Sequence, residues 1–474
     1  MTRSQTPAAA GAEDFGAART LVFDHAFLPD GWARDVRVTV QGGVISNVAP
    51  DAAGTGGERV KGIAIPGLPN LHCHTFQRGM AGLAERRGPS DDSFWTWRDV
   101  MYRFLGRLTP EDVEAIAAYA YAEMQERGFT AVGEFHYIHH GADGTPYADL
   151  AEMAARIVAA ASGTGIGLTL LPAFYAYGGF GAAPAVPGQR RFLNDPDRFL
   201  KLVEATRAAA ARLPSTAVGI APHSLRAVTP ETLAEVVKAT PQGPIHIHIA
   251  EQVKEVEDCL AWSGARPVAW LYDHMPVDAR WCLIHATHMT GDETRRLAAS
   301  GAVAGLCPIT EASLGDGIFN GPDYLAAGGR LGVGSDSNIE IDAAGELRLL
   351  EYSQRLGRRG RNLMTTEAGE STGHRLFTAA LAGGAQALGR PIGALAAGQR
   401  ADIVVLDSEH TSFSTVAREH WLDSWIFVPG RPAVDSVFTG GVKVVEGGRH
   451  LQRDAIAARY RVTLEKLLGR LLDA

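Results

Sequence analysis

Eight short apolar runs, each followed by a helical pattern or a long loop, constrain the fold of this chain more than any other feature. Strands that alternate with helices favour a parallel sheet, and eight such units close into a (β/α)8 barrel of the TIM type. A doubly wound open sheet is the alternative, but no G-x-G-x-x-G follows the first run, which disfavours it. The runs are 63–71, 129–135, 167–174, 217–221, 244–249, 281–284, 302–306 and 331–333.

The two ends of the chain have a different texture from the middle. Short alternating strands and Gly-containing hairpin turns occur both before the first run and after residue 400. We therefore expect one small β-sandwich domain built from both ends of the chain. The predicted parts are a disordered tail at 1–17, the small domain at 18–66 and 396–450, the barrel at 67–395, and a C-terminal helix at 451–474.

Composition excludes several classes of protein. The 474 residues are 46% hydrophobic and 21% charged, and the formal net charge of -8 without a basic patch argues against nucleic acid as a partner. The chain has no run of about 18 apolar residues that could cross a membrane, and its first residues do not read as a signal peptide. Four cysteines without a C-x-x-C pair fit free thiols in a reducing compartment, so a cytoplasmic location is expected.

Polar side chains stand at the ends of four of the eight runs. The first run leads into His72-Cys73-His74, and residues two apart on a strand point to the same face, so both imidazoles should aim at one point. The active site of a barrel forms at the C-terminal ends of its strands, so clusters from distant segments should meet there. The other clusters are His248 with Glu251 after the fifth run, His285 after the sixth and Asp336 after the eighth.

Three histidines and one aspartate from these clusters form a candidate metal site. Their donors suit a borderline-soft divalent ion; zinc is expected, although iron or another divalent ion suits the same ligands. Such a metal would lower the pKa of a water molecule and supply hydroxide near neutral pH. His246 lies on the same strand face as His248 and is an alternative to it as a ligand. The expected ligands are His72, His74, His248 and Asp336.

Three side chains are candidates for proton transfer. Glu251 can carry a proton from the water to a leaving nitrogen, although an acid in this place also suits a helix N-terminus. His285 can hydrogen-bond the attacking water or the departing group, and Asp336 can serve as both ligand and general base. Some related sites hold two metals bridged by a carbamylated lysine on the fourth strand. Residues 215–225 contain no lysine, which favours one metal.

The motifs together resemble a known family. Residues 66–74, the H-x-x-E at 248–251, the histidine after the sixth run and Gly-Ser-Asp-Ser at 334–337 resemble the mononuclear deaminase branch of the amidohydrolase superfamily. Within it, segments 74–80, 94–98 and 133–137 are similar to the formimidoylglutamate deiminases of histidine degradation. The resemblance covers roughly residues 18–465. It implies hydrolysis of the formimino C=N of N-formimino-L-glutamate to N-formyl-L-glutamate and ammonia.

The resemblance also implies a pocket for a substrate with two carboxylates, which arginine can bind in a bidentate manner. The two arginines can equally be solvated or cap a helix, and the glutamine and tyrosine can be packing groups. Family members are commonly oligomeric, so a homodimer is expected. The residues that the resemblance assigns to substrate binding are Gln77, Arg98, Tyr137, His223 and Arg226.

Two rival functions remain open at this point. The first is a purine or other heteroaromatic aminohydrolase of the same superfamily, which would want stacking and amide groups around a ring rather than two arginines. The second is a non-catalytic barrel that serves as an assembly module. Such a protein should have lost its ligands, whereas here every expected position is filled.

Overall fold

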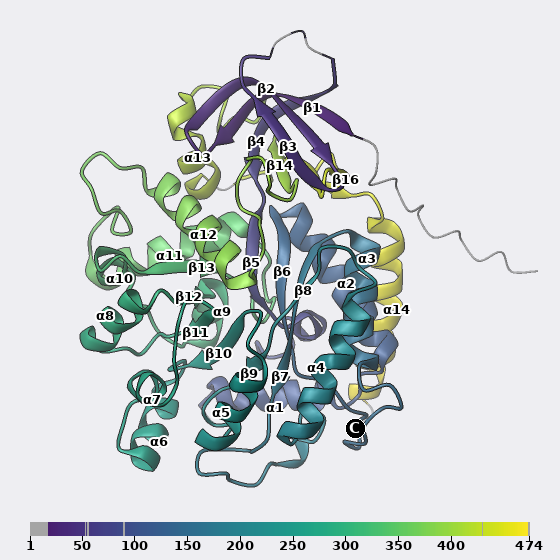
Figure 1. Cartoon of the computed structure of the whole chain (residues 1–474), viewed down its shortest axis with the longest axis vertical. Helices are drawn as coiled ribbons and strands as arrows, with labels where there is room; N and C mark the ends of the chain where they lie inside the picture. Colours follow the sequence, from purple (N-terminus) through teal and green to yellow (C-terminus); the bar gives the residue numbers. More distant parts are fainter. Residues whose placement is uncertain (1–17, 53, 55, 89–90, 429, 473–474) are drawn as a thin grey trace, which may run out of the picture.

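The computed structural model describes residues 18–472 except 53, 55, 89–90 and 429, so the predicted tail at 1–17 lies outside the described residues. Parallel strands surrounded by helices form the middle of the chain, and a second β-rich layer lies above them (Figure 1). The barrel strands are β5 (Leu68–Cys73), β6 (Phe129–His136), β7 (Gly167–Phe174), β8 (Ala217–Val218) with β9 (Ala221–Pro222), β10 (Ile245–Ile249), β11 (Trp281–His285), β12 (Val303–Leu306) and β13 (Arg330–Val333).

Single parallel bridges close these strands into a barrel. Strands β5 to β9 pair in one group and β10 to β13 in another. The bridges Ile220–Ile245 and Ser224–His248 join the fourth strand to the fifth, and Cys73–Asp336 joins the first strand to the segment after the eighth. The predicted (β/α)8 barrel is therefore confirmed. The closure also brings residues from the first and last strands side by side.

The helices follow the strands along the chain and form the outer layer (Figure 1). Thr109 caps the N-terminus of α2 through its side chain, and Thr229 does the same for α5. In each helix a proline, Pro110 or Pro230, occupies the first helical position. The helices are α1 (Phe94–Leu105), α2 (Pro110–Glu126), α3 (Glu152–Thr164), α4 (Pro196–Ala210), α5 (Pro230–Ala239), α6 (Val253–Ser263), α7 (Pro267–His274), α8 (Gly291–Ser300), α9 (Pro308–Leu314), α10 (Gly321–Ala326), α11 (Ala343–Arg358), α12 (Thr372–Leu388), α13 (Trp421–Phe427) and α14 (Arg453–Leu472).

Both ends of the chain contribute to one mixed sheet, in the order β17-β16-β15-β14-β4-β1-β2-β3. The predicted small domain from both chain ends is present, and its strands are hydrogen-bonded as a single sheet with a separate apolar core that includes Phe23, Val38, Ile403 and Phe438. Its strands are β1 (Arg19–Leu28), β2 (Gly31–Gln41), β3 (Val44–Ala49), β4 (Glu58–Pro66), β14 (Ile403–Leu406), β15 (Val434–Thr439), β16 (Val442–Glu446) and β17 (Arg449–His450).

The sequence predicts one strand in the first apolar run, at 63–71, whereas the structure has two. The first half of the run is β4, which pairs with β1 and β14 in the small sheet, and the second half is β5, which begins the barrel. Gly67 lies between them, and a Cβ there would come within 2.1 Å of the Thr130 side chain. Only glycine fits at this crossing point, where the chain passes from one sheet to the other.

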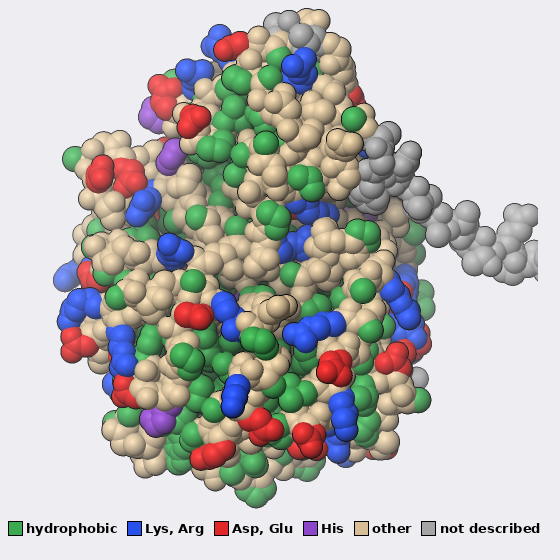
Figure 2. All heavy atoms as spheres, in the orientation of Figure 1, with side chains coloured by type: hydrophobic (Ala, Val, Ile, Leu, Met, Phe, Trp, Pro, Cys, Tyr) green, Lys and Arg blue, Asp and Glu red, His purple; other side chains and the backbone are tan. Residues whose placement is uncertain are grey.

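The outer surface carries charged side chains of both signs, and the C-terminal helix α14 packs against it. Basic and acidic side chains are interspersed on the face shown in Figure 2. Helix α14 packs along α2, where the Tyr460 ring stacks on Tyr119 with centroids 3.9 Å apart and Arg459 pairs with Glu114 at 2.7 Å. Among the described helices, none combines the length and apolar character needed to cross a membrane.

Candidate active site

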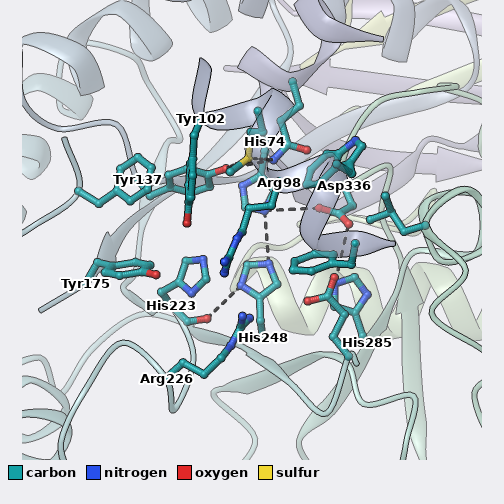
Figure 3. A pocket seen from close by; sticks show the side chains of 17 residues that line it. His74, Arg98, Tyr102, Tyr137, Tyr175, His223, Arg226, His248, His285 and Asp336 are labelled. Carbon is teal, nitrogen blue, oxygen red and sulfur yellow. Dashed lines mark hydrogen bonds and ion pairs between the residues drawn. The ribbon is translucent and has the colours of Figure 1, made fainter. Parts of the chain in front are cut away.

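The predicted site residues meet in one pocket at the C-terminal ends of the barrel strands (Figure 3). His72 lies beneath it and is fully buried. The predicted residues that line the pocket are His74, Gln77, Arg98, Tyr137, His223, Arg226, His248, Glu251, His285 and Asp336.

Four donor atoms at the floor of the pocket lie close enough together to bind one metal ion. Nε2 of His248 lies 3.2 Å from Nε2 of His72 and 3.3 Å from Nε2 of His74. Oδ1 of Asp336 lies 3.3 and 3.4 Å from the same two histidines. Zinc–ligand bonds of about 2.0–2.1 Å in a tetrahedron place donors about 3.3–3.4 Å apart. The predicted ligand set therefore fits one metal ion.

The hydrogen bonds that His74 and His248 make through Nδ1 also favour a metal ion at this site. Nδ1 of His74 lies 2.8 Å from the Phe135 carbonyl oxygen, and Nδ1 of His248 lies 3.0 Å from that of His223. A carbonyl oxygen only accepts, so each Nδ1 must donate and each Nε2 carries a lone pair. Two lone pairs that face each other at 3.3 Å cannot form a hydrogen bond. A cation between them satisfies both.

Burial keeps the three imidazoles neutral and ready to bind a metal. It lowers the pKa of His72 to about 3 and lowers the pKa values of His74 and His248 from their usual range. Burial alone would raise the pKa of Asp336, but its hydrogen bond with His72 and the nearby histidines lower it below the ordinary value. A neutral histidine set with an ionised carboxylate is the form that metals require.

His246, the alternative to His248 as a metal ligand, makes a hydrogen bond to the backbone instead. Its Nε2 lies 2.8 Å from the carbonyl oxygen of Ala387 near the end of α12, so this nitrogen donates to the backbone. It does not belong to the cluster of candidate ligands. The structure therefore places His248, and not His246, beside the other donors.

The backbone beside the site is strained. His285, Ala286, Asp336 and Ala250 have positive φ values of 66°, 47°, 42° and 51°, a region that side chains other than glycine rarely adopt. Each such residue costs about 1–3 kcal/mol and persists only where its surroundings hold it. Asn338 provides part of that support, because its side-chain amide donates to the carbonyl oxygens of Asp336 at 2.9 Å and of His74 at 3.1 Å.

Glu251 and His285 face each other beside the metal donors. Nε2 of His285 lies 3.8 Å from both Oε1 of Glu251 and Oδ2 of Asp336. Burial raises the pKa of Glu251 to about 7. Burial would lower the pKa of His285, but Glu251, a hydrogen bond to Glu311 and Asp336 together raise it to about 10. At neutral pH His285 therefore keeps its proton, and Glu251 is the member of the pair that gains or loses one.

Glu311 is a site residue that sequence reasoning missed. Its Oε1 accepts the Cys307 N–H at 2.9 Å and lies 3.3 Å from Nδ1 of His285. This contact directs Nε2 of His285 toward the pocket. Glu134 was missed as well: it accepts from the Thr75 N–H at 3.1 Å and from the Thr75 hydroxyl at 2.8 Å, and so fixes the turn that follows His74.

The two predicted arginines have no acidic partner among the ion pairs of the described residues, and the Nε atom of each is buried without a hydrogen bond. Both side chains extend toward the space beside His248 (Figure 3). The guanidinium carbon of Arg98 lies 4.5 Å from the centroid of the Trp95 ring, and that of Arg226 lies 5.7 Å from it. Two unpaired cations in one pocket predict an anionic ligand.

Gln77, Tyr137 and His223, the remaining predicted residues, also line the pocket. Nε2 of Gln77 donates to the Tyr137 hydroxyl at 3.0 Å, and this hydroxyl approaches the Met101 sulfur at 3.2 Å. The His223 ring packs edge-on against Tyr175, with centroids 4.7 Å apart. Tyr175 also lines the pocket and was not predicted. These side chains thus offer amide, hydroxyl and imidazole groups to a polar ligand.

Comparisons with known proteins agree with this geometry. A profile described as the amidohydrolase family matches residues 63–444, and one described as formimidoylglutamate deiminase HutF, N-terminal domain, matches residues 20–62. The chain is 51% identical to a formimidoylglutamate deiminase from Pseudomonas aeruginosa, over 95% of this chain and 99% of that protein.

Solved structures show the same architecture. An amidohydrolase crystal structure from Brucella melitensis superposes with a TM-score of 0.92 at 55% identity, covering 95% of this chain and all of that one. An adenosine deaminase from Xanthomonas campestris with bound zinc superposes with a TM-score of 0.78 at 21% identity, covering 95% of this chain and 98% of that one. The second likeness concerns the fold alone.

Proposed function

The chain belongs to the amidohydrolase family, and from this premise we propose that it hydrolyses N-formimino-L-glutamate to N-formyl-L-glutamate and ammonia. The observation that carries the proposal is the pair of unpaired arginines beside the metal donors. The substrate joins one amidine, which needs an activated water, to two carboxylates, which need cations. Arg98 and Arg226 supply two guanidiniums that can each bind a carboxylate in a bidentate manner.

We assign a single zinc ion to His72, His74, His248 and Asp336, because three imidazoles and a carboxylate are typical zinc ligands, and a water molecule would take a further coordination position. When bound, the metal supplies a Lewis acid that lowers the pKa of a water molecule toward neutrality. A cluster of four protein donors leaves the chain's other polar groups free for the substrate. Those groups are Glu251 and His285 on one side and the two arginines on the other.

Glu251 is the group best placed to move the proton. With its pKa near 7, its carboxylate can take a proton from the attacking water and return it to the nitrogen that leaves as ammonia. His285, held through Nδ1 by Glu311, presents Nε2 to the same space and can hydrogen-bond the attacking water. Asp336 uses Oδ1 toward the histidine ligands and keeps Oδ2 toward His285.

Substrate analogues test the proposal directly. N-formimino-4-aminobutyrate lacks the α-carboxylate, and N-formimino-L-2-aminobutyrate lacks the distal carboxylate. If both arginines bind carboxylates, each analogue should lose about 30-fold or more in kcat/KM relative to N-formimino-L-glutamate, because each leaves a buried guanidinium unpaired. Equal kcat/KM values for all three compounds, from an ammonia-release assay, would show that the arginines do not select the substrate.

The pH dependence of the reaction should follow Glu251. Burial raises its pKa to about 7, so the carboxylate is ionised above this pH and protonated below it. A protonated Glu251 cannot accept a proton, so we expect kcat/KM to fall as the pH is lowered through about 7. The profile is measured with metal content checked at each pH. A flat profile between pH 6 and 8 at full metal content would contradict this assignment.

Trp95 should matter for binding more than for chemistry. Its ring lies beside both guanidiniums, and a cation–π contact contributes about 0.5–2 kcal/mol. We expect Trp95→Leu to raise KM by about 3–30-fold with little change in kcat, whereas Trp95→Phe keeps a ring and should recover part of the loss. Steady-state kinetics of both variants test this; identical KM values for leucine and wild type would contradict it.

A further inference from the structure

A second group of metal-ligand side chains lies directly beside the first. His285, Cys307 and Asp336 each offer one donor atom, and these three atoms lie within 4.8 Å of one another. All three residues are buried. We propose that they form a second metal site, which takes a thiophilic divalent cation such as Zn²⁺ or Cd²⁺ and whose occupancy inhibits the enzyme.

Asp336 connects the two sites through its two carboxylate oxygens. Oδ1 lies 3.3 Å from Nε2 of His72 and 3.4 Å from Nε2 of His74, within the first donor cluster. Oδ2 lies 3.8 Å from Nε2 of His285 on the other side. A carboxylate in this position can bridge two cations. The second cation therefore does not require Asp336 to leave the first.

Cys307 gives the second site its chemical preference. It follows β12 as the residue before α9, and its sulfur belongs to the donor cluster. A thiolate selects Zn²⁺ and similar soft ions over Mg²⁺ or Ca²⁺. As the metal–sulfur bond forms, the thiol releases its proton to water, and His285 binds as the neutral imidazole after releasing its own.

The surroundings favour a further positive charge. Oε1 of Glu311 accepts the Cys307 N–H at 2.9 Å, Oε2 of Glu346 accepts the Ile309 N–H at 3.0 Å, and Oε1 of Glu251 lies 3.8 Å from Nε2 of His285. Within the described chain, Oε1 of Glu346 and Oδ2 of Asp316 are buried without a hydrogen-bond partner. Such a concentration of buried carboxyl groups is stabilised by a cation. Glu251 can supply a fourth donor.

The spacing of the donors predicts that the second site is the weaker one. Zinc bonds of about 2.0–2.1 Å to nitrogen and oxygen and about 2.3 Å to sulfur place tetrahedral donors about 3.3–3.6 Å apart. Neighbouring donors in the first cluster lie 3.2–3.4 Å apart, whereas in the second Nε2 of His285 and Oδ2 of Asp336 lie 3.8 Å apart and must move closer together. Cd²⁺ is larger and requires less movement. The first site should therefore fill first.

Occupancy of the second site should stop the reaction because it removes groups that the proposed chemistry uses. Nε2 of His285 and Oδ2 of Asp336 face the space where the attacking water must stand. A cation bound there withdraws both groups from that water. The expected behaviour is activity with one metal per chain and inhibition by excess thiophilic metal.

Titration with cadmium tests the proposal. Enzyme that holds one zinc per chain is titrated with Cd²⁺, while bound zinc, bound cadmium, the ultraviolet thiolate-to-cadmium charge-transfer band and ammonia release are followed. Wild type should retain its zinc, bind one cadmium, develop the band and lose at least 10-fold in activity. Cys307→Ser should keep its one-zinc activity, show no band and require at least 10-fold more cadmium for inhibition.

The control is Cys259→Ser, another buried cysteine, which lies on α6 and belongs to neither donor cluster. It should behave as wild type. If Cys307→Ser does not fold, Cys307→Ala and the ¹¹³Cd chemical shift of the wild-type complex report sulfur ligation instead. Replacement of zinc by cadmium without a charge-transfer band, or a band and inhibition unchanged in the Cys307 variant, would overturn the proposal. The binding readouts do not depend on the identity of the substrate.

Discussion

Replacing Glu251 by glutamine should lower kcat by about 10²–10⁴-fold, the range expected for loss of a general acid–base group. Glutamine keeps the size of the side chain but cannot carry a proton. Glu251 lies outside the four-donor cluster, so the variant should keep one metal per chain. Steady-state rates and metal analysis on the same preparation measure both quantities.

Glu257→Gln provides a matched control, because Glu257 is an exposed residue of α6 six positions further along the chain. It should retain wild-type kcat. If Glu251→Gln turned over substrate at a normal rate, Glu251 would have no part in proton transfer. If Glu251→Gln lost its metal instead, Glu251 would serve to maintain the metal site.

Removal of the Arg226 guanidinium should produce the second large effect. Truncating one partner of a buried charge pair costs about 2–5 kcal/mol, so Arg226→Ala should lower kcat/KM by about 30-fold to several thousand-fold. Arg98 is the other arginine among the described residues that line the pocket, and Arg226 is not one of the metal donors. Metal content should therefore remain at one per chain.

The specificity of this loss separates binding from misfolding. The analogue whose missing carboxylate belongs on Arg226 should lose much less activity in Arg226→Ala than N-formimino-L-glutamate does. Arg207→Ala, on α4 outside the pocket, should have no effect. An equal loss for all substrates, or loss of metal, would mean that Arg226 stabilises the site and does not bind a carboxylate.

Much of the fold could be predicted because it depends on local patterns. Apolar runs alternate with helical segments, and caps such as Thr109-Pro110 mark where helices begin. The division of the first run into β4 and β5 could not be predicted, because both halves are continuously apolar and only the contact of Gly67 with Thr130 shows where the chain changes sheet. The domain boundaries and the homodimer stay predictions.

The metal donors could be predicted from one rule, that parallel barrel strands bring their C-terminal ends together. His72, His248 and Asp336 are far apart in sequence, but His72 and His248 are the penultimate residues of β5 and β10, and Asp336 lies just after β13. Glu311 could not be found in this way, since it lies within α9 and acts only through its contact with His285. The positive φ values of His285 and Asp336 leave no mark in the sequence, because the surrounding packing imposes them.

Ammonia release from N-formimino-L-glutamate, with metal content determined on the same sample, tests the central claim most directly. The proposal predicts rapid release of one ammonia per substrate, with N-formyl-L-glutamate as the other product and about one zinc per active chain. Bound metal without release, or release from a purine such as guanine but not from N-formimino-L-glutamate, would contradict the assigned substrate and leave the heteroaromatic aminohydrolase in its place.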